Sequence, residues 1–163
     1  MKLDESFYRR KNVVTVAKEL LGKVLYTRIG AAITGGVIVE TEAYSQRERG
    51  SHAFRGKTKR NKVMFETGGI AYVYLCYGVH HMFNVVTNGA GAADAVLVRA
   101  LEPYMGEDVM MLRTGKKSTR RITSGPGLLT KALGITSVLN GKFLGGSEVW
   151  IENTGLKISN MKI

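Results

Sequence analysis

The sequence contains very little cysteine and proline. Its 163 residues include one cysteine, Cys76, and two prolines. A single cysteine has no partner for an intramolecular disulfide, which is typical of proteins from reducing compartments. The first residues, MKLDESFYRRKN, lack the apolar stretch of a secretory signal, and no window reaches the roughly 20 apolar residues that span a bilayer. These absences predict a protein of the cytoplasm and nucleoid, or of a nucleus, that is not secreted and has no membrane partner.

Acidic residues are also scarce. Lys and Arg total 24 against 13 Asp and Glu, which gives a formal net charge of +11. Such an excess attracts polyanions, of which nucleic acid is the commonest; a basic enzyme without a nucleic-acid partner is the alternative. Hydrophobic residues make up 44% of the chain, enough for one core, so we expect a single domain over residues 1–163.

Hydrophobic periodicity predicts an α+β fold in which strands dominate the middle of the chain. Asn12 and Gly22 bound a helical pattern, and GAAITGG (30–36) and the polar stretch 45–62 are expected to be a turn and a long loop. The predicted helices cover 13–21, 107–113 and 126–133. The predicted strands cover 23–29, 37–44, two runs of a hairpin within 70–88 that turns at Gly78, 95–103 closed by Pro103, and two or three short strands after residue 140.

The stretch ETEAY (40–44) places acidic residues at the end of an apolar strand. Strict alternation puts Val37, Val39, Thr41 and Ala43 on a core face and Ile38, Glu40, Glu42 and Tyr44 on the other. The second face turns from apolar to acidic, as a strand does where it leaves the core and enters a cleft. A solvated edge with two ordinary glutamates is the alternative, and periodicity does not choose between Glu40 and Glu42.

Arg99 lies among aliphatic residues in AVLVRALEP, where a cation requires a partner. A carboxylate from ETEAY is the natural partner. An arginine there keeps such a carboxylate ionised, and an ionised carboxylate is able to activate a water as a general base. A purely structural ion pair is the competing interpretation.

Aromatic and basic residues suggest contacts with nucleic acid. In AYVYLCYG, Tyr77 precedes the turn glycine, a position from which an aromatic side chain wedges between base pairs, and Tyr44 and Tyr74 are candidates to stack on an extracted base. Tyrosines are also simply good strand formers, and we prefer this interpretation for Tyr72.

The three histidines, Cys76 and the glutamates fit no metal-ligand spacing, so neither a metal nor another cofactor is expected. Two loops carry the candidate phosphate contacts: Arg55, Lys57, Lys59, Arg60 and Lys62, and then Lys116, Lys117, Arg120 and Arg121.

Five stretches in order, GVIVETEAY, SHAFRGKTKRNKVMF, YVYLCYGVHHMFNVVT, AVLVRALEP and SGPGLLTKALGI, closely resemble the alkyladenine (3-methyladenine) DNA glycosylases of the monofunctional mammalian type. The resemblance runs from about residue 13 to 144. It implies an α+β domain with a curved, mainly antiparallel sheet, flanking helices and a protruding β-hairpin, similar to the C-terminal domain of formyltransferases. It also implies that the chain is shorter at its C-terminus, KISNMKI, than family members usually are.

The resemblance further implies a monomer that binds double-stranded DNA through the minor groove and flips alkylated or deaminated purines out of the helix. Such an enzyme of base excision repair hydrolyses the N-glycosidic bond of 3-methyladenine, 7-methylguanine or hypoxanthine without a metal and leaves an abasic site. The family's roles fall on the following residues: Glu42 as general base, Arg99 beside the nucleophilic water, Tyr44, Tyr74 and His52 around the flipped base, Asn84 against the amino group of normal guanine, and Tyr77 as the intercalating residue.

Two other functions remain open from the sequence. A non-catalytic protein that binds damaged DNA would use the same pocket. An RNA-binding module of similar fold would account for the basic charge, but it would leave the pairing of Glu42 with Arg99 without a purpose.

Overall fold

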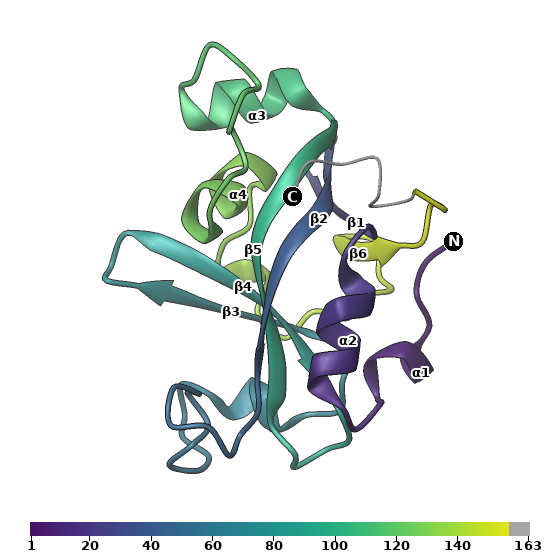
Figure 1. Cartoon of the computed structure of the whole chain (residues 1–163). Helices are drawn as coiled ribbons and strands as arrows, with labels where there is room; N and C mark the ends of the chain where they lie inside the picture. The colour runs from purple at the N-terminus through teal and green to yellow at the C-terminus, as the bar shows by residue number, and fades with distance from the viewer. Residues whose placement is uncertain (157–163) are drawn as a thin grey trace.

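Antiparallel pairing organises the middle of the chain. The computed structural model describes residues 1–156 and contains a six-stranded sheet of order β3-β4-β5-β2-β1-β6, in which all neighbouring strands are antiparallel (Figure 1). The predicted α+β fold with a mainly antiparallel sheet is confirmed. The strands are β1 Val24–Ile29, β2 Ala32–Tyr44, β3 Ala71–Cys76, β4 His80–Thr87, β5 Asp94–Met105 and β6 Val149–Glu152.

Helices flank this sheet and supply much of the apolar interior. Buried side chains of α2 and α4, such as Leu20 and Leu133, join Ile38 of β2 and Val98 of β5 in the largest hydrophobic cluster. Burial of such side chains removes apolar surface from water and stabilises the fold. The helices are α1 Glu5–Tyr8, α2 Val13–Leu20, α3 Glu107–Thr114 and α4 Pro126–Leu133, with short 3-10 turns η1 Lys62–Phe65 and η2 Ser137–Leu139.

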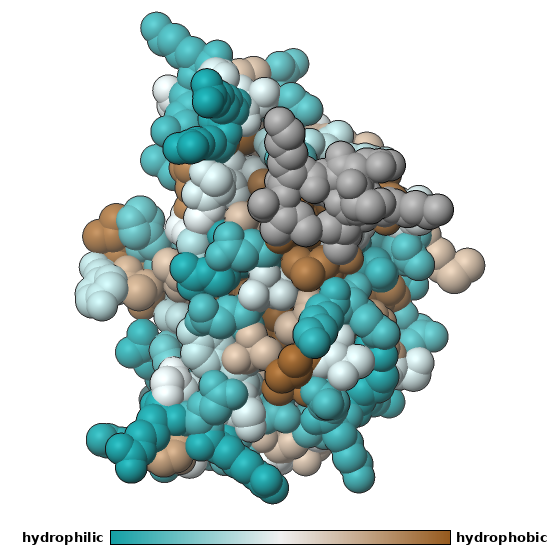
Figure 2. Space-filling view, in the orientation of Figure 1, coloured by the Kyte–Doolittle hydropathy of each residue, from teal (hydrophilic) through white to brown (hydrophobic). Residues whose placement is uncertain are grey.

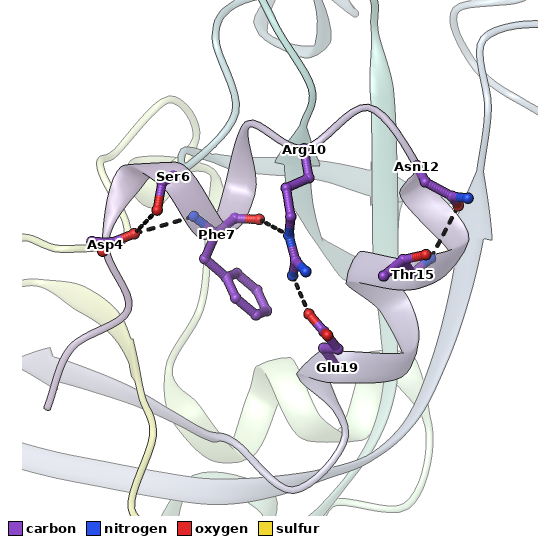
Figure 3. Close-up of polar contacts among 7 residues, drawn as sticks. All are labelled: Asp4, Ser6, Phe7, Arg10, Asn12, Thr15 and Glu19. Carbon is purple, nitrogen blue, oxygen red and sulfur yellow. Dashed lines mark hydrogen bonds and ion pairs between the residues drawn. The ribbon is translucent and has the colours of Figure 1, made fainter.

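Polar contacts fix the beginning of α2, the helix behind the ETEAY strand (Figure 3). The side chain of Asn12 accepts a hydrogen bond from the backbone N–H of Thr15 at 3.1 Å, as expected of an N-cap. Arg10 donates to the carbonyl of Phe7 at 3.1 Å and forms an ion pair with Glu19. Arg10 therefore connects α1, a short helix that the sequence patterns did not reveal, to α2.

Two predicted strand boundaries are wrong. Of the segment 30–36, only Gly30 and Ala31 form a turn, because β2 begins at Ala32 and includes Gly35 and Gly36. A Cβ on Gly35 would lie 2.6 Å from the ring of Tyr26, so these glycines serve close packing rather than a turn. Pro103 does not end its strand either. Pro103 pairs with Gly36 at a register shift in the β2–β5 ladder. On its other side β5 has no neighbouring strand there, because β4 pairs only with residues 94–97. The missing N–H of proline is therefore tolerated.

The strict alternation predicted over 37–44 is also wrong, because the β2–β5 ladder contains bulges. Ile38 pairs with Leu101 and Glu40 with Ala100, which leaves Val39 without a partner. As a result Ile38 is fully buried in the main core while Val39 is partly exposed. The next pair, Thr41 with Val98, leaves Arg99 unpaired on β5. Bulges of this kind redirect side chains and are common beside active sites.

The predicted hairpin and loops are present. The hairpin β3–β4 turns through Tyr77 and Gly78, which both have positive φ, and no helix or strand is assigned between residues 45 and 61. Of the strands predicted after residue 140, the described part contains β6; KISNMKI (157–163) lies outside the described residues. Within residues 1–156, no helix is long and apolar enough to cross a membrane.

We expect Asn12→Ala to lower the free energy of unfolding by about 1 kcal/mol, because the first turn of α2 loses its capping oxygen. Urea denaturation followed by circular dichroism measures this change. Asn12→Asp keeps an acceptor at the same position and should stay within a few tenths of a kcal/mol of the unmodified protein. An equal loss in both variants would show that the cap is not what Asn12 contributes.

Candidate active site

The two bulges bring Arg99 within reach of both glutamates of ETEAY. The Nε of Arg99 lies 3.2 Å from Glu40 Oε1 and donates a hydrogen bond to it, and Nη1 of Arg99 lies 3.6 Å from Glu42 Oε2. The expectation that Arg99 pairs with a carboxylate of this strand is confirmed, and it pairs with both. The cation thereby offsets the cost of placing two carboxylates next to each other.

Glu42 and Glu40 differ in their surroundings. The hydroxyl of Tyr44 donates a hydrogen bond to Glu42 Oε1, so the Glu42 carboxylate is held between a tyrosine and Arg99. Among the described side chains, Glu40 forms a hydrogen bond or ion pair with Arg99 alone, and its side chain is 58% exposed against 42% for Glu42. Glu42 is thus the better fixed and less solvated carboxylate of the pair.

A pocket has Tyr44, the tyrosine that donates a hydrogen bond to Glu42, in its wall. It has a volume of about 140 Å³, which is smaller than the roughly 300 Å³ or more of most ligand pockets and suits one flat ring system. All four residues predicted to surround a flipped base line it together, although they come from β2, the 45–61 loop, β3 and β4. The complete lining is Tyr44, Gly50, Ser51, His52, Met64, Tyr72, Tyr74, Asn84 and Ala95.

The aromatic side chains in this pocket contact one another. The rings of His52 and Tyr74 lie 4.3 Å apart, and those of Tyr72 and Tyr74 lie 5.4 Å apart. Partial burial, and then the Arg60 guanidinium, lower the pKa of His52. Burial raises the pKa of Tyr74, and the negative charge of Glu42 adds a smaller contribution in the same direction. The pocket therefore holds a neutral imidazole and a neutral phenol at neutral pH, one of them within the electrostatic reach of Glu42.

The tip of the hairpin is apolar and exposed. Tyr77 is 96% exposed, and Leu75 and Val79 beside it are also open to solvent. Figure 1 shows this hairpin extending away from the rest of the sheet. Tyr77 has a φ of 52°, which is uncommon for a residue other than glycine. The backbone thus adopts a costly conformation at the residue that is predicted to intercalate.

Both basic loops adjoin the site. The first includes Ser51 and His52 of the pocket wall. The second contacts β5 next to Arg99, through a bridge between Ala100 and Ser124. All nine predicted phosphate-contacting residues are exposed, and none forms an ion pair with another described residue. Figure 2 shows hydrophilic side chains over the α3 region and over the loop at the lower left, with the hairpin between them.

Sequence reasoning missed part of this pocket. Met64, Ser51 and Ala95 line it, yet nothing in their local sequence distinguishes them from core residues. The sequence favours a purely structural Tyr72 in its strand, but this residue lines the pocket and its hydroxyl lies 3.1 Å from Nδ1 of His52. The i, i+2 spacing of Tyr72 and Tyr74 was the signal that could have placed both in the wall. Within the described chain, no three His, Cys, Asp or Glu side chains gather closely enough to hold a metal ion.

Comparisons with known proteins agree with this arrangement. Residues 6–163 match the sequence model of methylpurine-DNA glycosylase. A protein of Carboxydothermus hydrogenoformans named 3-methyladenine DNA glycosylase is 50% identical over 149 residues, which are 91% of this chain and 78% of that protein.

Two further relatives carry the same name. The protein of Methanoculleus marisnigri is 53% identical over 144 residues, covering 88% of this chain and 74% of its own length. The protein of Chlamydia abortus is 44% identical over 153 residues, covering 91% and 80%. The family match and these identities lead to one conclusion: the chain belongs to the methylpurine-DNA glycosylase family, whose enzymes are hydrolases of N-glycosidic bonds.

Proposed function

We propose that this protein is a monofunctional DNA glycosylase of base excision repair. It flips an alkylated or deaminated purine out of duplex DNA and hydrolyses its N-glycosidic bond, leaving an abasic site. The observation that carries the proposal is the Glu42 carboxylate, held between Tyr44 and Arg99 beside an aromatic pocket for one ring system. A general base that deprotonates a water and a binding site for a flat leaving group are thereby placed next to each other.

The proposed chemistry follows from the positions of these groups. Glu42 accepts a proton from a water, and the water oxygen forms a bond to C1′ of the deoxyribose as the N-glycosidic bond breaks. The bonding electrons leave with the purine. The sugar carries positive charge in the transition state, and the nearby Glu42 carboxylate stabilises it. Arg99 orients the carboxylate, because its guanidinium lies 3.6 Å from Glu42 Oε2.

The pocket suits alkylated and deaminated purines, the class that includes 3-methyladenine, 7-methylguanine and hypoxanthine. Aromatic rings of His52 and Tyr74 offer faces on which a purine stacks. Alkylated purines that carry a positive charge become neutral when they leave and need little help, whereas neutral hypoxanthine depends more on the catalytic groups. Asn84 is buried in the pocket wall, with its side chain fixed to the carbonyl of Tyr72 at 3.3 Å. Its fixed side chain would exclude the exocyclic amino group of normal guanine.

We expect Glu42→Gln to reduce excision of hypoxanthine from duplex DNA at least 100-fold, because an amide does not accept the proton of water and a general base contributes roughly 100- to 10,000-fold. Single-turnover incubation followed by alkaline cleavage of abasic sites measures the rate. Binding to the same duplex should change little.

Glu40→Gln is the matched control, since Glu40 contacts the same arginine without the bond to Tyr44. Its rate should stay within about fivefold of the unmodified protein, as for an exposed ion pair. A large loss in Glu40→Gln with activity kept in Glu42→Gln would mean that the other carboxylate is the base. No abasic sites from the unmodified protein, together with tight binding of damaged duplex, would identify a non-catalytic binder.

We expect Tyr77→Ser to weaken binding of a hypoxanthine-containing duplex about 10-fold or more, because the wedge that fills the vacated stack is lost and stacking contributes roughly 1–3 kcal/mol per base. Fluorescence anisotropy with labelled duplex measures the affinity. Tyr104→Ser serves as control, because Tyr104 is an exposed tyrosine outside the hairpin and the pocket. Equal affinities of all three proteins would argue against intercalation by Tyr77.

The double variant Lys57→Gln, Lys59→Gln should lower the salt dependence of DNA binding. Each phosphate contact contributes about −0.9 to the slope of log K against log salt concentration, so the slope should decrease in magnitude by about 2. Lys142→Gln is the control, since Lys142 already pairs with Glu148 at 3.1 Å. An unchanged slope in the double variant would place the DNA backbone elsewhere.

A further inference from the structure

Arg60 is one of the nine predicted phosphate contacts, but its side chain lies against the hairpin. Nη2 of Arg60 donates a hydrogen bond to the carbonyl of Leu75 at 3.3 Å. The carbon of the guanidinium lies 5.9 Å from the centre of the Tyr74 ring, within the range of a cation–π contact. Both partners belong to β3, the strand whose tyrosines line the pocket. Arg60 therefore connects the long basic loop to the pocket wall.

The residue that follows Arg60 fixes the backbone of this loop. Asn61 is 3% exposed, and its side-chain amide donates hydrogen bonds to the carbonyls of His52 at 2.7 Å and Gly56 at 3.1 Å. The same side chain accepts a hydrogen bond from the backbone N–H of Thr58 at 2.6 Å. These bonds satisfy a buried amide, which would be costly to leave without partners. The backbone that carries Arg60 is therefore held next to the pocket.

The positive charge of Arg60 acts on three side chains of the pocket wall. Partial burial, and then this charge, lower the pKa of His52. Burial raises the pKa of Tyr72, and the charge of Arg60 opposes that rise. Burial also raises the pKa of Tyr74, and Arg60 again acts in the opposite direction. Arg60 is not among the described residues that line the pocket, so its charge acts on a bound base from behind the wall.

We propose that Arg60 is a specificity-determining residue, which biases the pocket toward neutral purines and against purines that carry a positive charge. This inference rests on the proposed function. Two cations beside one tyrosine ring repel each other, so Arg60 disfavours the entry of a charged base such as 7-methylguanine. A neutral base such as hypoxanthine enters the pocket without this repulsion, and the difference between the two determines selectivity.

The bias acts on binding and not on the step that breaks the bond. As the N-glycosidic bond breaks, its electrons move onto the departing base. Hypoxanthine then changes from neutral toward negative, and 7-methylguanine changes from positive toward neutral. Arg60 favours both changes, because each adds negative charge near a cation. Rates at saturating protein should therefore depend on Arg60 about equally for the two bases, whereas rates below saturation should not.

Single-turnover excision below and above saturation tests this difference. In Arg60→Gln, the ratio of hypoxanthine to 7-methylguanine excision below saturation should fall about 2- to 5-fold, as expected for one exposed cation beside an aromatic ring. With saturating protein the ratio should stay nearly constant. Equal losses for both bases below saturation would make Arg60 a phosphate contact only and would overturn the proposal. A fall of the same size at saturation would also overturn it, because the effect would then lie in the bond-breaking step.

Lys59→Gln is the matched control, because it removes one positive charge from the same loop. Lys59 is exposed and is not part of the described pocket lining. We expect this variant to weaken excision of both bases by the same factor and to leave their ratio unchanged. If Lys59→Gln shifts the ratio as much as Arg60→Gln does, the net charge of the loop determines the preference, and the proposal is wrong.

The effect of the charge on the pocket is measurable without any activity. An NMR titration of the free protein gives the pKa of His52, one of three histidines in the chain. This pKa should rise in Arg60→Gln, because removal of a nearby positive charge favours protonation of the imidazole, and it should change less in Lys59→Gln. An unchanged pKa in Arg60→Gln would overturn the proposal whether or not the protein is a glycosylase. If the unmodified protein excises neither base, the proposed function itself fails, and the titration does not depend on that result.

Discussion

The ion pair between Arg99 and the Glu42 carboxylate is the interaction on which the rest of the site depends. Two carboxylates at the end of one strand repel each other unless a cation lies close to both. Arg99 reaches Glu40 and Glu42 at 3.2 and 3.6 Å. It does so because the ladder between β2 and β5 skips Val39 and Arg99, and these irregularities redirect side chains that regular pleating would place elsewhere.

The residues around Glu42 hold its carboxylate in place and connect it to the pocket. Tyr44 connects Glu42 to the pocket, and β3, β4 and the long basic loop complete the wall. The hairpin that carries Tyr74 in the wall also carries Tyr77 at its exposed tip. A wedge and part of the pocket wall on one hairpin suit a protein that displaces a base from the stack and accepts it in the pocket.

The sequence predicts which residues belong to the site, but it does not predict the backbone geometry that brings them together. Alternation in ETEAY and the cation among aliphatic residues in AVLVRALEP predict the pairing of Arg99 with a glutamate, because unpaired charges are costly in apolar strands. The bulges at Val39 and Arg99 were not predictable, since they depend on the pairing of two strands more than fifty residues apart in the chain. The place of Tyr72 in the pocket wall is not predictable either, because its contact with the loop residue His52 exists only in the folded protein.

A double-mutant cycle of Glu42 and Arg99 tests the central claim most directly, because it isolates the coupling between two residues from their separate effects. The measurement is the single-turnover rate of hypoxanthine excision for Arg99→Ala, Glu42→Gln and the combined variant. If Arg99 acts by holding the Glu42 carboxylate in position, its replacement slows the unmodified enzyme strongly and slows Glu42→Gln very little. Equal losses from Arg99→Ala in both backgrounds would contradict this account.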